Sequence, residues 1–177
     1  EIGNALEVKE SLEVLAGGGP ADVVEITIEL AREMLRMAGK PDADVEAALK
    51  DGRAMDKWRQ MISAQGGDPD AKLPEAKEHH VVTATSSGFL SELDALQVGT
   101  ASWRLGAGRA RKEDAVQFGA GITLHAQLGD KVEAGAPLMT LHTDEPERFD
   151  RALEALQGSF KIEASAPARK IVLERIK

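Results

Sequence analysis

The sequence has 177 residues, of which 42% are hydrophobic, 29% are charged and 3% are aromatic, and its formal net charge is −8. That length suits one large domain or two small ones. The acidic charge and the lack of tyrosine argue against nucleic acid or an anionic membrane as a partner, and the lack of cysteine excludes disulfides and thiolate chemistry.

Targeting signals are absent from the sequence. No apolar run approaches the roughly 20 residues that cross a bilayer, and no signal peptide is visible. We therefore expect a cytoplasmic protein. The first residues, EIGNALEV, lack an initiating methionine and have the pattern of a helix, which suggests a start inside a longer protein.

The first third of the sequence predicts four helices. Asn4 is the expected N-cap of the first, which the glycines of AGGGP end. Pro20 opens a second helix over residues 21–38, whose apolar residues cover all but a narrow polar stripe, so we expect it to be mostly buried. Asp42 is the expected cap of a short third helix, and a fourth ends at Gly66.

Residues 67–80 are polar and contain glycine and proline, as is typical of a connection between two structural units. His79 and His80 stand at its end. Adjacent residues on a strand point to opposite faces, so this pair does not easily share one metal ion. We interpret both as residues of an exposed strand start.

Beyond Val81 the pattern becomes one of short strands. Residues 122–128 alternate between apolar and polar, which places Ile122 inward and His125 on the outer face. Further expected elements are helices over 94–108 and 145–158 and strands over 159–164 and 169–176.

The segment GDKVEAGAPLMTLHT, residues 129–143, resembles the hairpin of biotinyl and lipoyl carrier domains. Such domains present a lysine, typically between two methionines, at the tip of a turn. The sequence has no Met-Lys-Met, which nearly excludes a carrier function. We interpret the segment as a packed hairpin with a structural role.

The glycine-rich segment 105–121 contains Gly106 and Gly108 but no complete phosphate-binding motif. Arg109 and Lys112 carry positive charges that suit an anion. They suit a solvated loop beside Glu113 equally well.

Three segments in order, IGNALEVKESLEVL, GRAMDKWRQMISAQGGDP and LGAGRARKEDAVQFGAGITLHAQLGDKVEAGAPLMTLH, resemble the C-terminal part of pyrimidine-nucleoside phosphorylases, a family that includes thymidine phosphorylase. The resemblance covers essentially the whole chain. It implies an α/β protein of which this chain supplies an α+β part. That part would comprise the helical end of the large domain (1–66), a linker (67–80) and a hammerhead-like, barrel-sandwich β module (81–177).

The resemblance implies reversible phosphorolysis, in which phosphate attacks C1′ of a pyrimidine nucleoside to give the free base and a pentose 1-phosphate. It implies a homodimer whose cleft closes on the substrate. The family's phosphate loop, Asp-Lys-His-Ser-Thr-Gly-Gly, and its base-binding residues are not in this sequence. We therefore assign no catalytic residue to this chain and expect it to be inactive alone.

Three residues take roles from the resemblance. Arg109 and Lys112 match a segment near the cleft mouth that orders on closure. Glu10 matches one ligand of a monovalent cation, usually potassium, in the full-length protein; no cofactor is required otherwise. The alternative to a phosphorylase part is a non-catalytic binding or structural module.

Overall fold

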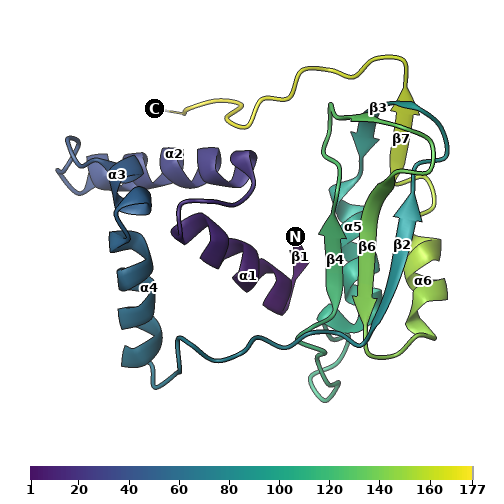
Figure 1. The fold of residues 1–177 in the computed structure, drawn as a ribbon, viewed down its shortest axis with the longest axis horizontal. Coiled ribbons are helices and arrows are strands. Elements are labelled where there is room, and N and C mark those ends of the chain that lie inside the picture. The colour runs from purple at the N-terminus through teal and green to yellow at the C-terminus, as the bar shows by residue number, and fades with distance from the viewer. Residues whose placement is uncertain (177) are drawn as a thin grey trace. The chain divides into compact units, whose positions relative to one another are not determined.

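A computed structural model describes residues 1–176 of the chain (Figure 1). All strand pairs are antiparallel in this part of the chain, so the fold is α+β, as the sequence predicts. The hammerhead-like identity of the β module stays a prediction. In chain order the elements are β1 (Ile2–Gly3), α1 (Asn4–Leu15), α2 (Ala21–Met37), α3 (Val45–Lys50), α4 (Arg53–Ala64), β2 (Glu78–Thr83), β3 (Gly88–Leu93), α5 (Ala95–Ser102), η1 (Trp103–Ala107), β4 (Gly121–Leu124), β5 (Lys131–Val132), β6 (Pro137–Thr143), α6 (Arg148–Ala155) and β7 (Phe160–Glu163).

The chain forms two compact units. The β-rich unit consists of Glu1–Glu7 and Leu73–Arg169, and the helical unit consists of residues 8–72 with the C-terminal residues from Lys170. The division into 1–66, 67–80 and 81–177 stays a prediction.

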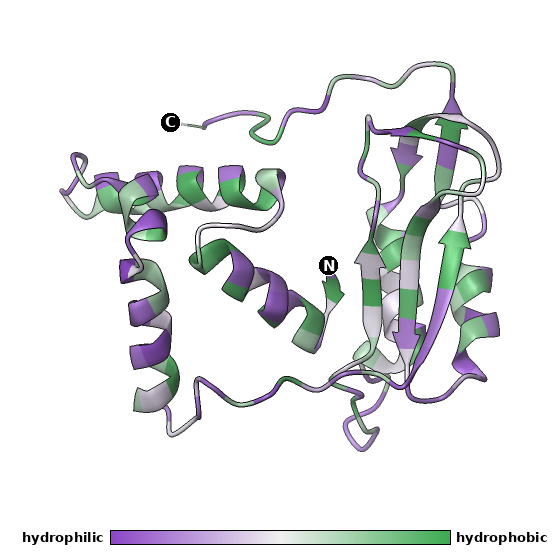
Figure 2. Ribbon diagram, viewed as in Figure 1, coloured by the Kyte–Doolittle hydropathy of each residue, from purple (hydrophilic) through white to green (hydrophobic). Residues whose placement is uncertain are grey.

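A four-stranded sheet in the order β1-β4-β6-β2 is the main layer of the β-rich unit. The central strand β6 places alternate side chains on opposite faces, and its inward Met139 and Leu141 are 1% and 0% exposed. Helices α5 and α6 cover that inward face and contribute Ala101 and Ala152 to the same core. Figure 2 shows the hydrophobic bands that recur along β4 and β6, as the sequence pattern predicts.

A second sheet, in the order β5-β3-β7, closes a smaller core around Leu90 and Leu138. The expected hairpin at residues 129–143 is only partly confirmed. Its two strands form, but β5 pairs with β3 whereas β6 pairs with β2 and β4. The turn between them is anchored elsewhere, because Gly135 N–H donates to the Ala84 carbonyl at 2.8 Å.

The helical unit confirms the four predicted helices and corrects two details. Asp44, not Asp42, caps α3, and its carboxylate accepts from Ala47 N–H at 2.9 Å. No residue of α2 is fully buried, although its apolar pattern predicts burial; Met34 is 64% exposed. The reason is that no layer among the described residues covers that face of α2. None of the described helices combines the length and the apolar character that crossing a membrane requires.

Two further expectations about the chain's ends are wrong. Ile2 and Gly3 form strand β1, which pairs with Ile122 and Gly121, whereas the local pattern predicts helix from the start. Residues 169–176 form no strand. A short apolar run needs a neighbouring strand for its backbone hydrogen bonds, and here Arg175 instead bonds to Glu33 of α2 at 2.6 Å.

Candidate functional site

The glycine-rich segment begins as a helix end and continues as an exposed loop. Asp94 caps α5 by accepting from Gln97 N–H at 2.9 Å. The single π-helical turn η1 follows and is interrupted at Gly106, whose φ of +110° is accessible to glycine at little cost. Residues 108–118 follow without regular structure, and Arg109 and Lys112 are both exposed there.

Gln117 holds the far end of this loop in place. Its Nε2 donates to Glu145 Oε1 at 2.6 Å, and its Oε1 accepts from Asp144 N–H at 2.8 Å and lies 3.1 Å from the Thr143 hydroxyl. Its own N–H donates to the Gly106 carbonyl at 2.9 Å. One half-buried amide therefore joins the loop to the end of β6 and the start of the α6 segment.

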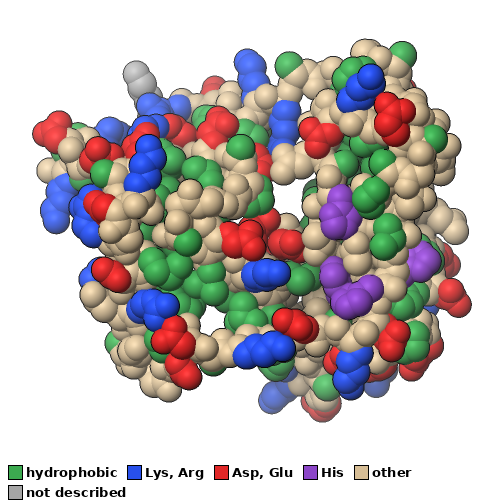
Figure 3. All heavy atoms as spheres, in the orientation of Figure 1, with side chains coloured by type: hydrophobic (Ala, Val, Ile, Leu, Met, Phe, Trp, Pro, Cys, Tyr) green, Lys and Arg blue, Asp and Glu red, His purple; other side chains and the backbone are tan. Residues whose placement is uncertain are grey.

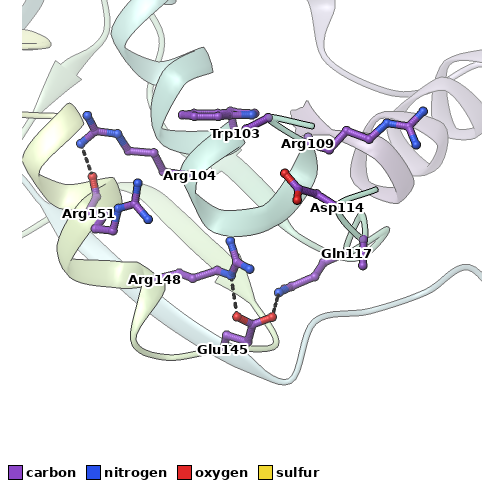
Figure 4. A pocket seen from close by; sticks show the side chains of 11 residues that line it. Trp103, Arg104, Arg109, Asp114, Gln117, Glu145, Arg148 and Arg151 are labelled. Carbon is purple, nitrogen blue, oxygen red and sulfur yellow. Dashed lines mark hydrogen bonds and ion pairs between the residues drawn. The ribbon is translucent and has the colours of Figure 1, made fainter. Parts of the chain in front are cut away.

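The space between the loop, η1 and α6 is a cavity of about 310 Å³ within the β-rich unit (Figure 4). We call it the arginine cavity. Its lining residues are Trp103, Arg104, Gly108, Arg109, Ala110, Asp114, Ala115, Gln117, Glu145, Arg148 and Arg151. Four guanidinium groups face two carboxylates in this lining, so the cavity is cationic although the chain as a whole is acidic.

Two of the four arginines have fixed partners. Arg148 bonds to Glu145 at 2.8 Å, and this hydrogen bond holds the pKa of the Glu145 carboxyl below its ordinary value. Arg104 bonds to Glu154 at 2.8 Å and to the Arg151 carbonyl at 2.7 Å. These pairs orient both side chains at the cavity wall.

The residues predicted from the sequence fall at three places. Arg109 lines the arginine cavity and donates to the Lys112 carbonyl at 3.3 Å, whereas Lys112 itself is not part of the lining. Glu10 is half-buried on α1. The structure tests none of the three proposed roles, which stay predictions.

The cation site predicted at Glu10 stays a prediction. No group of three or more histidine, aspartate or glutamate side chains is placed to hold a metal ion among residues 1–176. A cation in a protein site is normally held by several oxygen ligands, and Glu10 offers one carboxylate.

The α6 side of the cavity was not predicted from the sequence. Arg148 and Arg151 were included only in an amphipathic helix, where their spacing of three residues places them on one face. That spacing is a usable signal. The nearness of Arg104 and Trp103 to this face depends on the packing of α5, η1 and α6, which no local pattern contains.

The outer face of the four-stranded sheet carries a second polar cluster, which includes His79, His125 and His142. Figure 3 shows histidine side chains gathered on this face. His79 lies opposite His142 in the register of β2 and β6, and their Nδ1 atoms are 2.9 Å apart. The prediction that His125 lies on the outer face is confirmed, since it is exposed and its Nε2 lies 2.7 Å from the Thr140 hydroxyl.

The hydrogen bonds of this cluster fix the direction of its protons. The Thr123 hydroxyl donates to the Glu1 carboxylate at 2.8 Å, so it accepts from His142 Nε2–H at 3.0 Å. Because the pKa of His142 is lowered to about 4, the ring is neutral at pH 7, so its Nδ1 carries no proton and accepts from His79 Nδ1–H. His142 is thus held as a neutral imidazole between two partners.

We expect this neutral His142 to lower stability in acid. Burial, helped by His79 and His125, lowers the pKa of His142 from 6.5 to about 4. Between these values the unfolded chain binds a proton that the folded chain does not, so stability falls as the pH drops from 6.5 to 4. The shift would correspond to roughly 3 kcal/mol for a fully buried ring. Because the ring is half-exposed, we expect about 1 kcal/mol.

Urea unfolding at pH 7 and pH 4.5 measures this effect when the wild type is compared with His142→Gln. The variant keeps an amide that can bond to Thr123 but does not titrate. The wild type should lose more stability than the variant over this interval. Equal losses would contradict the assignment.

Two antiparallel sheets backed by α5 and α6, with a cationic cavity beside α6, define the β-rich unit as an α+β domain with a polar surface cavity. Residues 89–163 match the family described as the pyrimidine nucleoside phosphorylase C-terminal domain.

Known proteins align with almost the whole chain. Thymidine phosphorylase of Mycobacterium tuberculosis is 50% identical over 176 residues, which are 99% of this chain and 41% of that protein. Pyrimidine-nucleoside phosphorylases of Bacillus subtilis and Staphylococcus epidermidis are 39% and 37% identical over 182 residues, 97% of this chain and 42% of each relative. The chain thus spans about two fifths of the length of these relatives and matches their C-terminal portion.

Proposed function

We propose that this chain acts as the C-terminal part of a pyrimidine-nucleoside phosphorylase. The single observation that carries the proposal is the 50% identity to a thymidine phosphorylase across 99% of the chain. The reaction would be the reversible phosphorolysis of thymidine or uridine to the free base and a pentose 1-phosphate. No residue of this chain is assigned to the reacting atoms.

Phosphorolysis needs phosphate and nucleoside held in line and charge stabilised on the departing base. In this proposal the residues that do so lie outside the present chain. Arg109 and Lys112 would contribute by closing over the substrate cleft. The exposed loop that carries them supports this role, because it is joined to the rest of the unit through Gln117 and is otherwise open to solvent.

Three further features are proposed on the resemblance. The protein would act in the cytoplasm and as a homodimer. Glu10 would supply one ligand of a potassium ion whose other ligands lie outside this chain.

Phosphorolysis of uridine and thymidine with inorganic phosphate tests the proposal. We expect no turnover by residues 1–177 alone, and turnover by a longer protein that contains them together with a phosphate loop. In that protein Arg109→Gln should lower kcat/KM by about tenfold. Arg111→Gln, on the same loop, is the matched control.

Turnover by residues 1–177 alone would contradict the assignment of catalysis to other residues. A longer protein that folds and does not turn over either nucleoside would instead favour a non-catalytic binding or structural module.

A further inference from the structure

The arginine cavity contains a cation that lacks an anionic partner. Arg104 and Arg148 are each paired with a carboxylate, whereas Arg151 has no ion pair among residues 1–176. Guanidinium groups bind carboxylates and phosphates with two parallel hydrogen bonds. An external anion at Arg151 would therefore complete the set of pairs at this wall.

The two ends of the cavity differ in chemistry, as Figure 4 shows. Arg148 and Arg151 project from α6, the Trp103 indole lies across the top of the view, and the Asp114 carboxylate lies to the right. Asp114 has no ion pair among residues 1–176 and repels an anion, whereas Glu145 is paired with Arg148, so an anionic group is favoured at the α6 end beside Arg151. Arg109 points away from the α6 arginines and does not contribute to this end.

Trp103 offers a flat apolar surface at the top of the cavity in Figure 4. Trp103 is 41% exposed although it lines the cavity, so part of the residue is open to a ligand. The loop passes close to the indole at Gly108, where a Cβ atom would lie 2.8 Å from Trp103 Cδ1. Glycine at 108 therefore keeps the ring uncovered by a neighbouring side chain.

The dimensions suit a small ligand that has both an anionic and an aromatic part. About 310 Å³ lies at the lower end of the range for small-molecule sites, and it exceeds what a lone phosphate ion needs. A planar base stacks on an indole, and Asp114 can accept a hydrogen bond from an N–H group on the edge of that base.

We propose that the arginine cavity binds a nucleoside monophosphate. The phosphate bonds to Arg148 and Arg151, and the base stacks on Trp103 with its N–H edge toward Asp114. This site is separate from the phosphorolysis proposed above, because none of its polar anchors is assigned a role in that reaction. Loss of either proposal leaves the other standing.

Tryptophan fluorescence of residues 1–177 tests the proposal directly. The only other tryptophan, Trp58, lies in the helical unit, so a Trp58→Phe background isolates the signal of Trp103. We expect uridine 5′-monophosphate to quench this signal saturably. Uridine, ribose 5-phosphate and inorganic phosphate should each bind at least about tenfold more weakly, since each lacks one part of the ligand.

Matched arginine variants locate the binding. In the same background Arg151→Gln should weaken the binding of uridine 5′-monophosphate by about tenfold or more. Added salt should weaken this binding further. Arg111→Gln removes the same charge from the neighbouring loop outside the lining and should leave the affinity unchanged.

Three results would overturn the proposal. They are no saturable quenching by the nucleotide, equal loss of affinity in Arg151→Gln and Arg111→Gln, and equal affinity for inorganic phosphate, which would indicate an adventitious ion only. Circular dichroism of each variant confirms that a loss of binding is not a loss of fold.

Discussion

Gly121→Ala should lower the free energy of unfolding of the β-rich unit by about 3 kcal/mol or more. Gly121 has φ +156°, and a Cβ atom there would lie 2.4 Å from the Ile2 carbonyl oxygen and 3.1 Å from Gly3 Cα. Both contacts are with backbone, which cannot rotate aside as a side chain does. We therefore expect β1 to separate from β4. Urea unfolding followed by Trp103 fluorescence, in the Trp58→Phe background, measures the loss.

Gly129→Ala is the matched control for this change. Gly129 also has a positive φ, +95°, but no atom lies within 4 Å of the position of its Cβ. Its replacement introduces backbone strain alone, worth about 1–2 kcal/mol. If the two variants lose equal stability, the close approach of β1 and β4 does not exist in solution.

The pairing of β1 with β4 also shows what the sequence alone does not contain. Residues 122–128 alternate regularly, and that pattern correctly predicted the inward side of Ile122 and the outward side of His125. One of the two partners of β4 is strand β1, which lies more than a hundred residues away at Ile2 and Gly3. A strand of two residues is too short to show a period in its sequence. Local pattern thus predicted the first part of the strand and its faces, although β4 ends at Leu124 and not at residue 128. The neighbour of the strand depends on the global fold.

The difference between local pattern and global fold also explains which residues of the arginine cavity and of the histidine cluster were predicted. Arg109 stood out because its loop has an unusual composition, and it does line the arginine cavity. His79 pairs with His142, which is 63 positions away in the sequence. The adjacent pair His79-His80 gives no indication of this contact. His80 points to the other face of the sheet, against Phe149, as the opposite directions of adjacent strand residues require.

The exposed surface of α2 has a different cause. Its apolar residues predict burial, yet Leu30, Met34 and Met37 are 56%, 64% and 80% exposed. A hydrophobic pattern indicates which face of a helix can be buried. It does not indicate which other segment covers that face. The chain spans about two fifths of the length of its relatives. The apolar pattern of α2 and its exposure are therefore compatible, because a covering segment can belong to the part of the relatives that this chain does not match.

Gln117→Leu should lower the free energy of unfolding of the β-rich unit by about 2–4 kcal/mol. Leucine has a similar size but makes none of the three side-chain hydrogen bonds to Thr143, Asp144 and Glu145. Once Gln117 is lost, Glu145 keeps Arg148 as its side-chain partner among residues 1–176, and the loop loses its attachment to the end of β6. Urea unfolding followed by Trp103 fluorescence again gives the stability.

Trypsin provides a second measure of the same substitution, since the loop offers cleavage sites at Arg109, Arg111 and Lys112. Cleavage there should be faster in Gln117→Leu than in the wild type, because an unanchored loop opens more often. Gln157→Leu, at an exposed turn after α6, should change stability by less than about 0.5 kcal/mol and leave the cleavage rate unaltered. Unchanged cleavage in Gln117→Leu would mean that the loop is held by its own turn, through Asp114 and Arg111, and that Gln117 only supports β6.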